Sequence, residues 1–418
     1  MGEIPVEPIS IDLGFTNPYR PGAGHMPPHL AGREREHAEF DQLLRQDPVL
    51  KNLILTGLRG VGKTVLLETF KPRAVAAGWH WVGTDLSQSA SVSEESLATR
   101  ILTDLAVVTS SMTVKTPPPP SFGFESPHAL PPPATETPLS FQVLWQMYEA
   151  APGLIADKLK NVLTIVASQL IAQRGHARVV FAYDEAQNLS DNTTKQQYPL
   201  STLLDVFQYL QRSQIPFMLV LTGLPTMFPK LVEARTYSER MFRIVTLGKL
   251  DRQDSREAIT KPLDTAGCPI RFDDESVQEI CERSDGYPYF IQFICREVFD
   301  VWISQLRTGK RPAVSMEAIQ GRLDSDFFAG RWDKATDRQR DLLWVIAHVD
   351  DPEGEFSILE IVEKGKELLD KPFSPSHANQ MLVSLIEHGL IYKNRFGRYS
   401  FAVPLLSAFI RRTHALRR

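Results

Sequence analysis

The sequence has few cysteines, no long uncharged apolar run and no large excess of one charge. Cys268, Cys281 and Cys295 are its three cysteines and show no C-x-x-C spacing, so we expect neither a zinc site nor a disulfide framework. The nearest approach to a membrane-spanning stretch, residues 154–172, is broken by three charged residues. The formal net charge of −4 gives no global attraction to nucleic acid or anionic lipid, so any such binding needs a local patch.

Targeting signals are missing at the N-terminus as well. Residues 1–6 have neither the basic head nor the apolar core of a secretory signal, and Val6 stands where a myristoylation signal has Ser or Thr. We therefore expect a cytoplasmic protein. A chain of 418 residues, 43% hydrophobic and 23% charged, is long enough for two or three packed units.

The clearest motif that is present is a phosphate-binding loop. Its residues are Gly57, Leu58, Arg59, Gly60, Val61, Gly62, Lys63 and Thr64, which match G-x-x-x-x-G-K-[ST]. An apolar run of strand length precedes the loop, and a helical pattern starts at Val65. Glycines let backbone N–H groups approach phosphate, and the helix presents its positive end. We expect Lys63 to reach the terminal phosphates and Thr64 to hold Mg²⁺. A plain glycine-rich turn would not require this full set of residues and flanks.

A second motif is the pair of acids at Asp184 and Glu185. They end a short apolar run, residues 179–183, that predicts a buried strand of a parallel sheet. Such a strand delivers its terminal side chains to the edge where ligands bind. Asp184 is then placed to hold the Mg²⁺ shell, and Glu185 to orient and deprotonate the attacking water. Acids also follow strands as helix caps, but that explanation does not account for two adjacent acids in a chain with a phosphate loop.

Two shorter elements extend the pattern. Gly32-Arg33-Glu34, preceded by two apolar residues, lies some twenty residues before the loop, and Gly286-Tyr287-Pro288 opens a later helix. With the phosphate loop, these elements resemble the origin-recognition-like AAA+ ATPases and the STAND signalling ATPases. The resemblance runs from about Leu30 to the C-terminus, apart from a Pro-rich insertion. It implies that Gly32 and Arg33 shape the adenine pocket, that Pro288 packs on the adenine, and that the loop from Gly57 to Val65 contacts the nucleotide.

The same resemblance gives roles to Thr222 and Arg240. The apolar run 217–223 would be a strand between the loop strand and the Asp-Glu strand, and its terminal polar residue, Thr222 here and Asn in many AAA+ members, would sense the γ-phosphate. Arg240 is the first choice, and Arg243 the second, for an arginine finger that enters a neighbouring subunit; the alternative is a solvated arginine near a helix end. A typical AAA+ lid also supplies an arginine after the Gly-x-Pro element, but here none follows until Arg296.

Residues 333–418 resemble a winged helix. Helices are expected at 336–347, 357–369 and 374–388, followed by strands at 390–393 and 399–403. The third helix, the presumptive reader, has no Lys or Arg, whereas the wing offers Lys393, Arg395 and Arg398 as candidate DNA contacts. Basic residues further on, such as Arg411 and Arg412, could instead complement the end of a final helix.

The expected fold is α/β, with a P-loop AAA+ core whose parallel sheet carries helices on both faces. The predicted parts are an extended N-terminal segment at 1–28 that lies against the first domain, the core at 29–249, a helical lid at 250–325 and the winged helix at 333–418. A Pro-rich insertion at about 109–138 interrupts the core. This insertion is expected to be a plain surface loop, with a docking site for an SH3-like partner as the alternative.

These parts predict an ATPase that uses ATP and Mg²⁺ and is slow unless it assembles through an arginine finger. It would couple nucleotide state to the orientation of the winged helix and act on double-stranded DNA or on a DNA-bound partner. One alternative is a regulatory or defence signalling ATPase whose winged helix makes only protein contacts. Another is a scaffold that binds nucleotide without hydrolysis, against which Glu185 argues.

Overall fold

The computed structural model describes residues 16–22, 24–116, 135–268, 271–307, 314–395 and 397–413. The chain divides into two compact units, each built from segments that are distant in sequence. The sheet unit comprises residues 35–56 and 66–246, and the C-terminal unit comprises residues 1–34, 57–65 and 247–418. Within the described ranges, none of the helices is both long enough and apolar enough to cross a membrane.

The sheet unit is built on five strands in the order β2–β5–β6–β1–β7. They are β1 (Asn52–Gly57), β2 (His80–Val82), β5 (Val179–Tyr183), β6 (Phe217–Gly223) and β7 (Phe242–Leu247). The pairs β2–β5, β5–β6 and β1–β6 are parallel. All residues of β1, β5 and β6 are buried, because these strands are central and both faces of the sheet are covered. The predicted place of the 217–223 strand, between the loop strand and the Asp-Glu strand, is confirmed.

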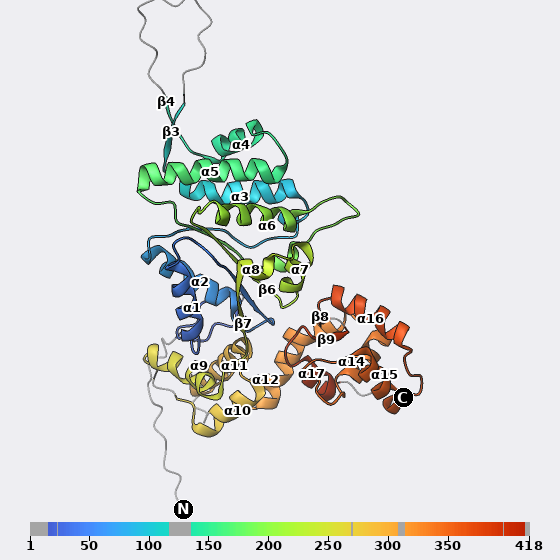
Figure 1. The fold of residues 1–418 in the computed structure, drawn as a ribbon. Helices are drawn as coiled ribbons and strands as arrows, with labels where there is room; N and C mark the ends of the chain where they lie inside the picture. The colour runs from blue at the N-terminus through green and yellow to red at the C-terminus, as the bar shows by residue number, and fades with distance from the viewer. Residues whose placement is uncertain are drawn as a thin grey trace, which may run out of the picture. The chain divides into compact units, whose positions relative to one another are not determined.

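Helices cover both faces of this sheet (Figure 1). They are α1 (Glu34–Leu44), α2 (Lys63–Ala76), α3 (Glu94–Thr109), α4 (Phe141–Ala150), α5 (Ile155–Arg174), α6 (Pro199–Arg212), α7 (Met227–Ala234) and α8 (Ser238–Met241), with short 3-10 turns η1 (Ser89–Ser91) and η2 (Ala186–Asn188). On one face, α3, α5 and α6 share an apolar core with β5 and β6. On the other, Phe40 of α1 stacks on Phe70 of α2 with ring centroids 4.2 Å apart. The apolar residues that recur at steps of three and four along α5 are buried in the first core, except that Ile155 is only partly buried.

Both ends of the segment expected as a Pro-rich insertion form regular structure. Helix α3 extends to Thr109, and β3 (Thr113–Thr116) pairs antiparallel with β4 (Thr135–Pro138). Threonine and valine are β-branched and favour strands, a signal that the neighbouring prolines obscured. Residues 117–134, which contain the proline runs, lie outside the described residues.

The described residues of the C-terminal unit form mainly helices, together with one two-stranded ribbon (Figure 1). Its elements are α9 (Arg252–Thr265), α10 (Asp274–Ser284), α11 (Pro288–Arg307), α12 (Met316–Leu323), the π-helical turn η3 (Asp324–Ala329), α13 (Gly330–Trp332), α14 (Asp337–Ile346), α15 (Ile358–Leu368), α16 (Pro375–Glu387), β8 (Ile391–Arg395), β9 (Arg398–Phe401) and α17 (Leu406–Thr413). Helix α11 contributes to two apolar cores. Ile291 and Ile294 pack with α9 and α10, while Phe290 and Phe293 pack with the segments from α13 to α17. The expected lid and winged helix therefore share this helix.

The described part of the N-terminal segment packs on the same helices. Tyr19 is fully buried in the core of α9, α10 and α11, and its hydroxyl donates to the Ile259 carbonyl. The N–H of Arg20 donates to Gln292 Oε1 at 3.0 Å. This differs from the expectation that the segment lies against the first domain, because the aromatic side chain of Tyr19 finds its apolar partners on the lid side.

The order of three helices followed by a ribbon is confirmed in the last part of the chain. Helices α14, α15 and α16 begin after Thr336, Ser357 and Ser374, and the side chain of each of these residues accepts an N–H of the first turn. Strands β8 and β9 pair antiparallel, and Phe356 adds a further bridge to Tyr399. Capping residues at the predicted positions account for the agreement of the boundaries.

Candidate nucleotide-binding site

The phosphate loop leaves strand β1 and enters helix α2, as the sequence predicted. Gly60 and Gly62 have φ of 79° and 89°, a region in which a side chain would be strained. Lys63 is the first residue of α2, so the N–H groups of this turn have no acceptor within the helix and suit an anion. The Lys63 ammonium donates to the Leu58 carbonyl at 2.9 Å, which holds the charge against the loop.

Arg33 supports the backbone of this loop. Its side chain is 6% exposed, and Nη2 donates to the carbonyls of Val61 and Gly248, each at 3.0 Å. The neighbouring Gly32 has φ of 63°, and a Cβ there would lie 2.2 Å from a carboxylate oxygen of Asp254. The structure thus brings the Gly32-Arg33 element onto the loop, where Arg33 acts as a positioning residue.

The Gly286-Tyr287-Pro288 element also touches the loop. Gly286 has φ of 73° and Pro288 opens helix α11, which fits the expected tight entry into a helix. The next residue, Tyr289, donates its N–H to the Gly60 carbonyl at 3.1 Å. Sequence reasoning missed Tyr289, although its place directly after Pro288 was the one available signal.

Arg59 connects the loop to the last part of the chain. Its Nη1 donates to the Gly389 carbonyl at 3.1 Å. Gly389 follows helix α16 with φ of 68°, the left-handed conformation that commonly ends a helix. The two residues are 330 positions apart, and no local pattern in the sequence indicates the contact.

In the sheet unit, Asp184 and Glu185 follow the buried strand β5. Asp184 is 4% exposed, and its Oδ1 accepts the N–H of Glu185 at 2.7 Å. Glu185 has φ of 53°, a left-handed conformation that is uncommon outside glycine and is concentrated at functional sites. Gln187, which sequence reasoning missed, donates its side-chain amide to the Glu185 carboxylate. Lys230 in turn donates to the Gln187 carbonyl at 3.0 Å, and burial lowers the pKa of this lysine.

Two buried hydroxyls lie near this edge of the sheet. Thr222 pairs with Leu55 in the β1–β6 register, and Thr56 pairs with Gly223. Both threonines are at most 5% exposed, and neither hydroxyl has a hydrogen-bond partner in the part of the chain that the structure describes. A buried polar group without a partner costs about 1–3 kcal/mol, so water or a ligand is expected to bind there. This observation fits the role predicted for Thr222 and adds Thr56, which was not predicted.

The two finger candidates differ in their contacts. Arg240 lies in α8 with an exposed side chain, and across the described residues its guanidinium enters no ion pair. Arg243 donates to Glu39 of the same chain at 2.9 Å. Arg240 is therefore the freer of the two.

Basic residues of the expected wing and of α17 already have partners within the chain. Arg398 donates to both carboxylate oxygens of Glu360 at 3.1 Å, and Arg412 pairs with Asp324. Arg395 belongs to β8, but its side chain lies outside the described part of the structure, and Lys393 has polar contacts of its own. The third helix exposes no Lys or Arg; its exposed polar side chains near the start are Ser376, His377, Asn379 and Gln380, and the acid Glu387 is exposed at its end.

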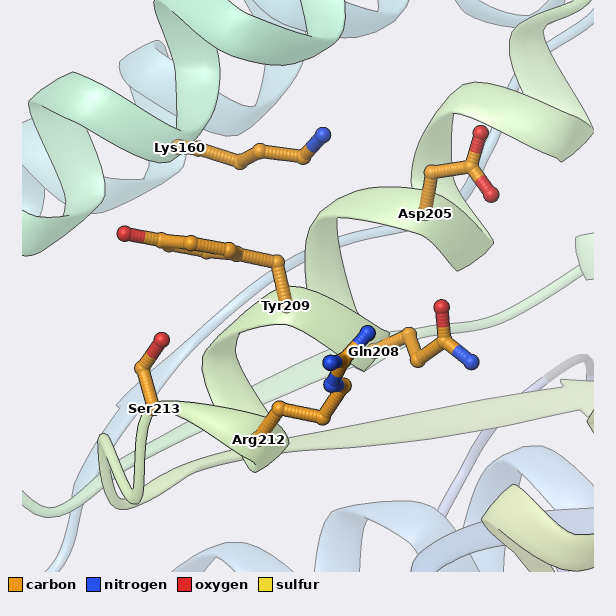
Figure 2. Close-up of a pocket in the computed structure, with 6 residues that line it drawn as sticks. All are labelled: Lys160, Asp205, Gln208, Tyr209, Arg212 and Ser213. Carbon is orange, nitrogen blue, oxygen red and sulfur yellow. The ribbon is translucent and has the colours of Figure 1, made fainter.

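A separate cavity of about 450 Å³ lies between α5 and α6 of the sheet unit (Figure 2). It is lined by Lys160, Asp205, Gln208, Tyr209, Arg212 and Ser213. Lys160 extends over the ring of Tyr209, with Nζ 5.8 Å from the ring centroid (Figure 2). Arg212 and Ser213 end α6 just before β6 begins, so this cavity lies toward the amino-terminal edge of the sheet. Asp184 and Thr222 lie at the opposite, carboxyl-terminal edge.

The acid of this cavity already has strong partners. Arg235 and Tyr237 both donate to the Asp205 carboxylate, with the Arg235 bonds at 2.9 Å. Although burial raises the pKa of Asp205, these hydrogen bonds hold it below its ordinary value. Among the described residues, no group of three or more His, Cys, Asp or Glu side chains is arranged to hold a metal ion.

Solved structures match nearly the whole chain. The Walker-type ATPase Paby2304 of Pyrococcus abyssi is 17% identical over 91% of this chain and 96% of its own, with a TM-score of 0.55. The Aeropyrum pernix ORC2 protein in its ADP form is 12% identical over 95% of this chain and 98% of its own, with a TM-score of 0.54. At these identities the likeness shows the fold alone. No curated protein matches the chain.

Family models match two parts of the sequence. Residues 29–220 match the family described as AAA ATPase domain, a range that contains the phosphate loop, Asp184 and Glu185. Residues 325–410 match a Domain of unknown function (DUF8462). The chain therefore has the AAA+ fold, with residues 29–220 similar to the AAA ATPase domain family and residues 325–410 similar to a domain of unknown function.

Proposed function

We propose that this protein binds ATP with Mg²⁺, hydrolyses it, and uses the nucleotide state to set the orientation of its C-terminal winged helix. The observation that carries the proposal is the phosphate loop, where Gly60 and Gly62 adopt positive φ and Lys63 and Thr64 open helix α2. Backbone N–H groups of residues 57–65 would bind the phosphates, and Lys63 would neutralise their charge.

The remaining residues divide the chemistry between them. Thr64 and Asp184 would hold Mg²⁺, with the other ligand positions filled by phosphate and water, and the bound metal would supply charge neutralisation on the phosphates. Glu185 would orient and deprotonate the attacking water. Thr222, whose buried hydroxyl has no partner in the described residues, would accept or donate a hydrogen bond at the reacting phosphate. The adenine pocket would be lined by Gly32, Arg33 and Pro288. Arg33 would also hold the loop through its hydrogen bond to the Val61 carbonyl.

The test separates binding from hydrolysis. Glu185→Gln keeps the shape of the side chain and removes its basicity, so ATP turnover should fall to background while the affinity for ATP stays within about threefold of the parent. Lys63→Ala should instead lose nucleotide binding. Turnover is measured by phosphate release and affinity by calorimetry. If the parent protein binds ATP but, like Glu185→Gln, does not hydrolyse it, the enzyme assignment is contradicted. That result favours a scaffold that binds nucleotide without hydrolysis.

The output of the switch is proposed to be DNA or a DNA-bound partner, with Lys393, Arg395 and Arg398 as phosphate contacts. A second candidate is a signalling ATPase whose winged helix binds protein. Two observations favour that candidate: Arg398 is already paired with Glu360, and the third helix exposes no Lys or Arg. The two outputs differ in salt dependence, so a titration of DNA binding at increasing salt distinguishes them.

A further inference from the structure

The cavity between α5 and α6 has a polar lining, with no aliphatic side chain among the described residues that form it (Figure 2). Asp205, Gln208, Tyr209 and Arg212 come from one face of α6, because they follow at the spacing i, i+3, i+4 and i+7. Lys160 of α5 lies across from them, over the Tyr209 ring. The volume of about 450 Å³ falls within the range of about 300–1,000 Å³ that is usual for small-molecule sites.

The polar face of an amphipathic helix ordinarily faces only water, so this face needs a closer comparison. Here α5 places an ammonium group over one side of it, and the side chains converge on one cavity (Figure 2). Gln208, Tyr209 and Ser213 make no side-chain hydrogen bond to any residue that the structure describes. Their amide and hydroxyl groups therefore remain available to a ligand.

The charges of the cavity are positive in sum. Its one acid, Asp205, is already matched by Arg235, whose two hydrogen bonds to the carboxylate are 2.9 Å long. Lys160 pairs at 3.3 Å with Asp157 of its own helix, but this aspartate is 53% exposed, and such surface pairs are weak. In the described part of the chain, the Arg212 guanidinium has neither an ion pair nor a hydrogen bond. A cation suits the end of α6, yet all five donors of this group are unused.

This lining selects a hydrophilic anion. A phosphate monoester carries a charge of about −1.5 to −2 at pH 7, which matches one ammonium and one guanidinium. Phosphate oxygens also accept paired hydrogen bonds from the planar guanidinium of Arg212. The groups of Gln208, Tyr209 and Ser213 can both donate and accept hydrogen bonds, as the hydroxyls of a sugar require. An apolar ligand would find no aliphatic partner among the lining residues that the structure describes.

We propose that this cavity is a second ligand site of the protein, and that it binds a small hydroxylated phosphate monoester of the sugar-phosphate class. Lys160 and Arg212 would bind the phosphate, and Gln208, Tyr209 and Ser213 would bind the hydroxyls. All of the lining residues belong to the sheet unit and lie away from the edge that carries Asp184 and Thr222. The inference therefore does not depend on the proposed ATP binding.

The test uses glucose 6-phosphate as the probe. It is titrated by calorimetry into the full-length protein carrying Lys63→Ala, so that the ammonium of the phosphate loop does not contribute. We expect saturable binding with a dissociation constant below about 1 mM. Glucose, which lacks the phosphate, should not bind. Gluconate, a hydroxylated carboxylate with the same number of carbon atoms, should bind about tenfold more weakly or worse, because it carries a single charge.

Variants of the two cations locate the binding. Lys160→Ala and Arg212→Ala, each added to Lys63→Ala, should weaken the binding of glucose 6-phosphate about tenfold or more. Arg212→Lys should have a smaller effect, because it keeps the charge and loses only the paired hydrogen bonds. Two substitutions serve as controls and should leave the affinity unchanged. Lys158→Ala removes an ammonium that lies over a different ring, Tyr148, and Arg174→Ala removes an arginine from the end of α5.

Each outcome supports or overturns the inference. It is overturned if glucose 6-phosphate does not bind, or if Lys160→Ala and Arg212→Ala bind it as tightly as Lys63→Ala alone. Equal affinities for gluconate and glucose 6-phosphate overturn the assignment of a phosphate ester. If Arg212→Ala lowers the melting temperature, Arg212→Gln decides, because it keeps a long polar side chain without the charge; an unchanged affinity in that variant overturns the inference. A parent that fails to bind ATP contradicts only the proposed function.

Discussion

At the scale of single residues, Arg33 shows how a buried charge can support the backbone of a binding loop. Its guanidinium bonds the carbonyls of Val61 and Gly248, which joins the loop backbone to the chain that follows β7. Hydrogen bonds from charged donors contribute about 1.5–3 kcal/mol each, more than neutral ones. The loop must keep its shape when phosphate arrives, so rigidity here serves affinity.

Removal of this side chain should therefore weaken both the fold and the site. Arg33→Ala removes the donor from the buried Val61 carbonyl and from the carbonyl of Gly248, which is exposed, and we expect the free energy of unfolding to fall by about 1–3 kcal/mol. ATP affinity should fall as well, by at least tenfold, because the loop loses the hydrogen bonds that hold its backbone in place. Thermal unfolding and calorimetry measure the two effects. The control is Arg35→Ala, an arginine two positions away whose side chain is 85% exposed and should contribute about 0–1 kcal/mol. Equal effects of both substitutions would contradict the role of Arg33.

At the scale of helices and strands, local sequence signals were sufficient to predict the elements. They did not predict contacts between residues that are far apart in the sequence. The phosphate loop, the capped starts of α14 to α16 and the buried strand before Asp184 all follow from residues within a few positions of each other. The contacts from Arg59 to Gly389 and from Tyr289 to Gly60 depend on tertiary packing, which no periodicity encodes. The β3–β4 ribbon was missed because prolines nearby dominated the interpretation.

The ribbon of β8 and β9, the expected wing, is the element whose proposed output the structure constrains most directly. The hydrogen bonds from Arg398 to Glu360 offset part of the positive charge that DNA would need. Binding to DNA through phosphates loses affinity steeply with salt, with a slope that reflects the number of contacts. The two proposed outputs therefore predict different titrations.

If the wing binds DNA, fluorescence anisotropy with a labelled duplex should show binding at about 50 mM salt that falls at least tenfold by about 200 mM. The double substitution Arg395→Glu and Arg398→Glu should abolish it, and Arg322→Ala, on the lid helix α12, should not. Glu360→Gln should strengthen binding, because it frees Arg398. An absence of binding at low salt in the parent would contradict the DNA output and leave the protein-contact alternative.

At the scale of the whole molecule, neither compact unit is one continuous stretch of the sequence. The C-terminal unit contains the phosphate loop, the expected lid and the expected winged helix, and α11 contributes Phe290 to one of its cores and Ile291 to another. A change at the loop can therefore reach Gly389 through one hydrogen bond of Arg59. Such an arrangement suits a two-state switch, in which the nucleotide has different contacts in each state.

A switch that needs assembly makes a prediction about mixed proteins. If Arg240 enters the site of a neighbouring copy, Arg240→Ala should bind ATP normally but lose the rise of specific activity with protein concentration. Arg243→Ala is the control, because Arg243 is bonded to Glu39 of its own chain and should keep the concentration dependence. The defect should be complemented in trans. Arg240→Ala keeps Glu185 but lacks the finger, and Glu185→Gln keeps Arg240 but lacks the base. Each protein alone should therefore be inactive.

A mixture of these two inactive proteins should therefore hydrolyse ATP. Copies of Glu185→Gln would supply Arg240 to the sites of the Arg240→Ala copies, and phosphate release should reach a maximum near equal amounts of the two. An arginine in trans is typically worth about 10³–10⁵ in rate, so even partial complementation would stand far above background. If the mixture stays inactive while both proteins bind ATP and assemble, Arg240 does not act in trans, and slow hydrolysis within a single copy would have to rely on residues of its own chain.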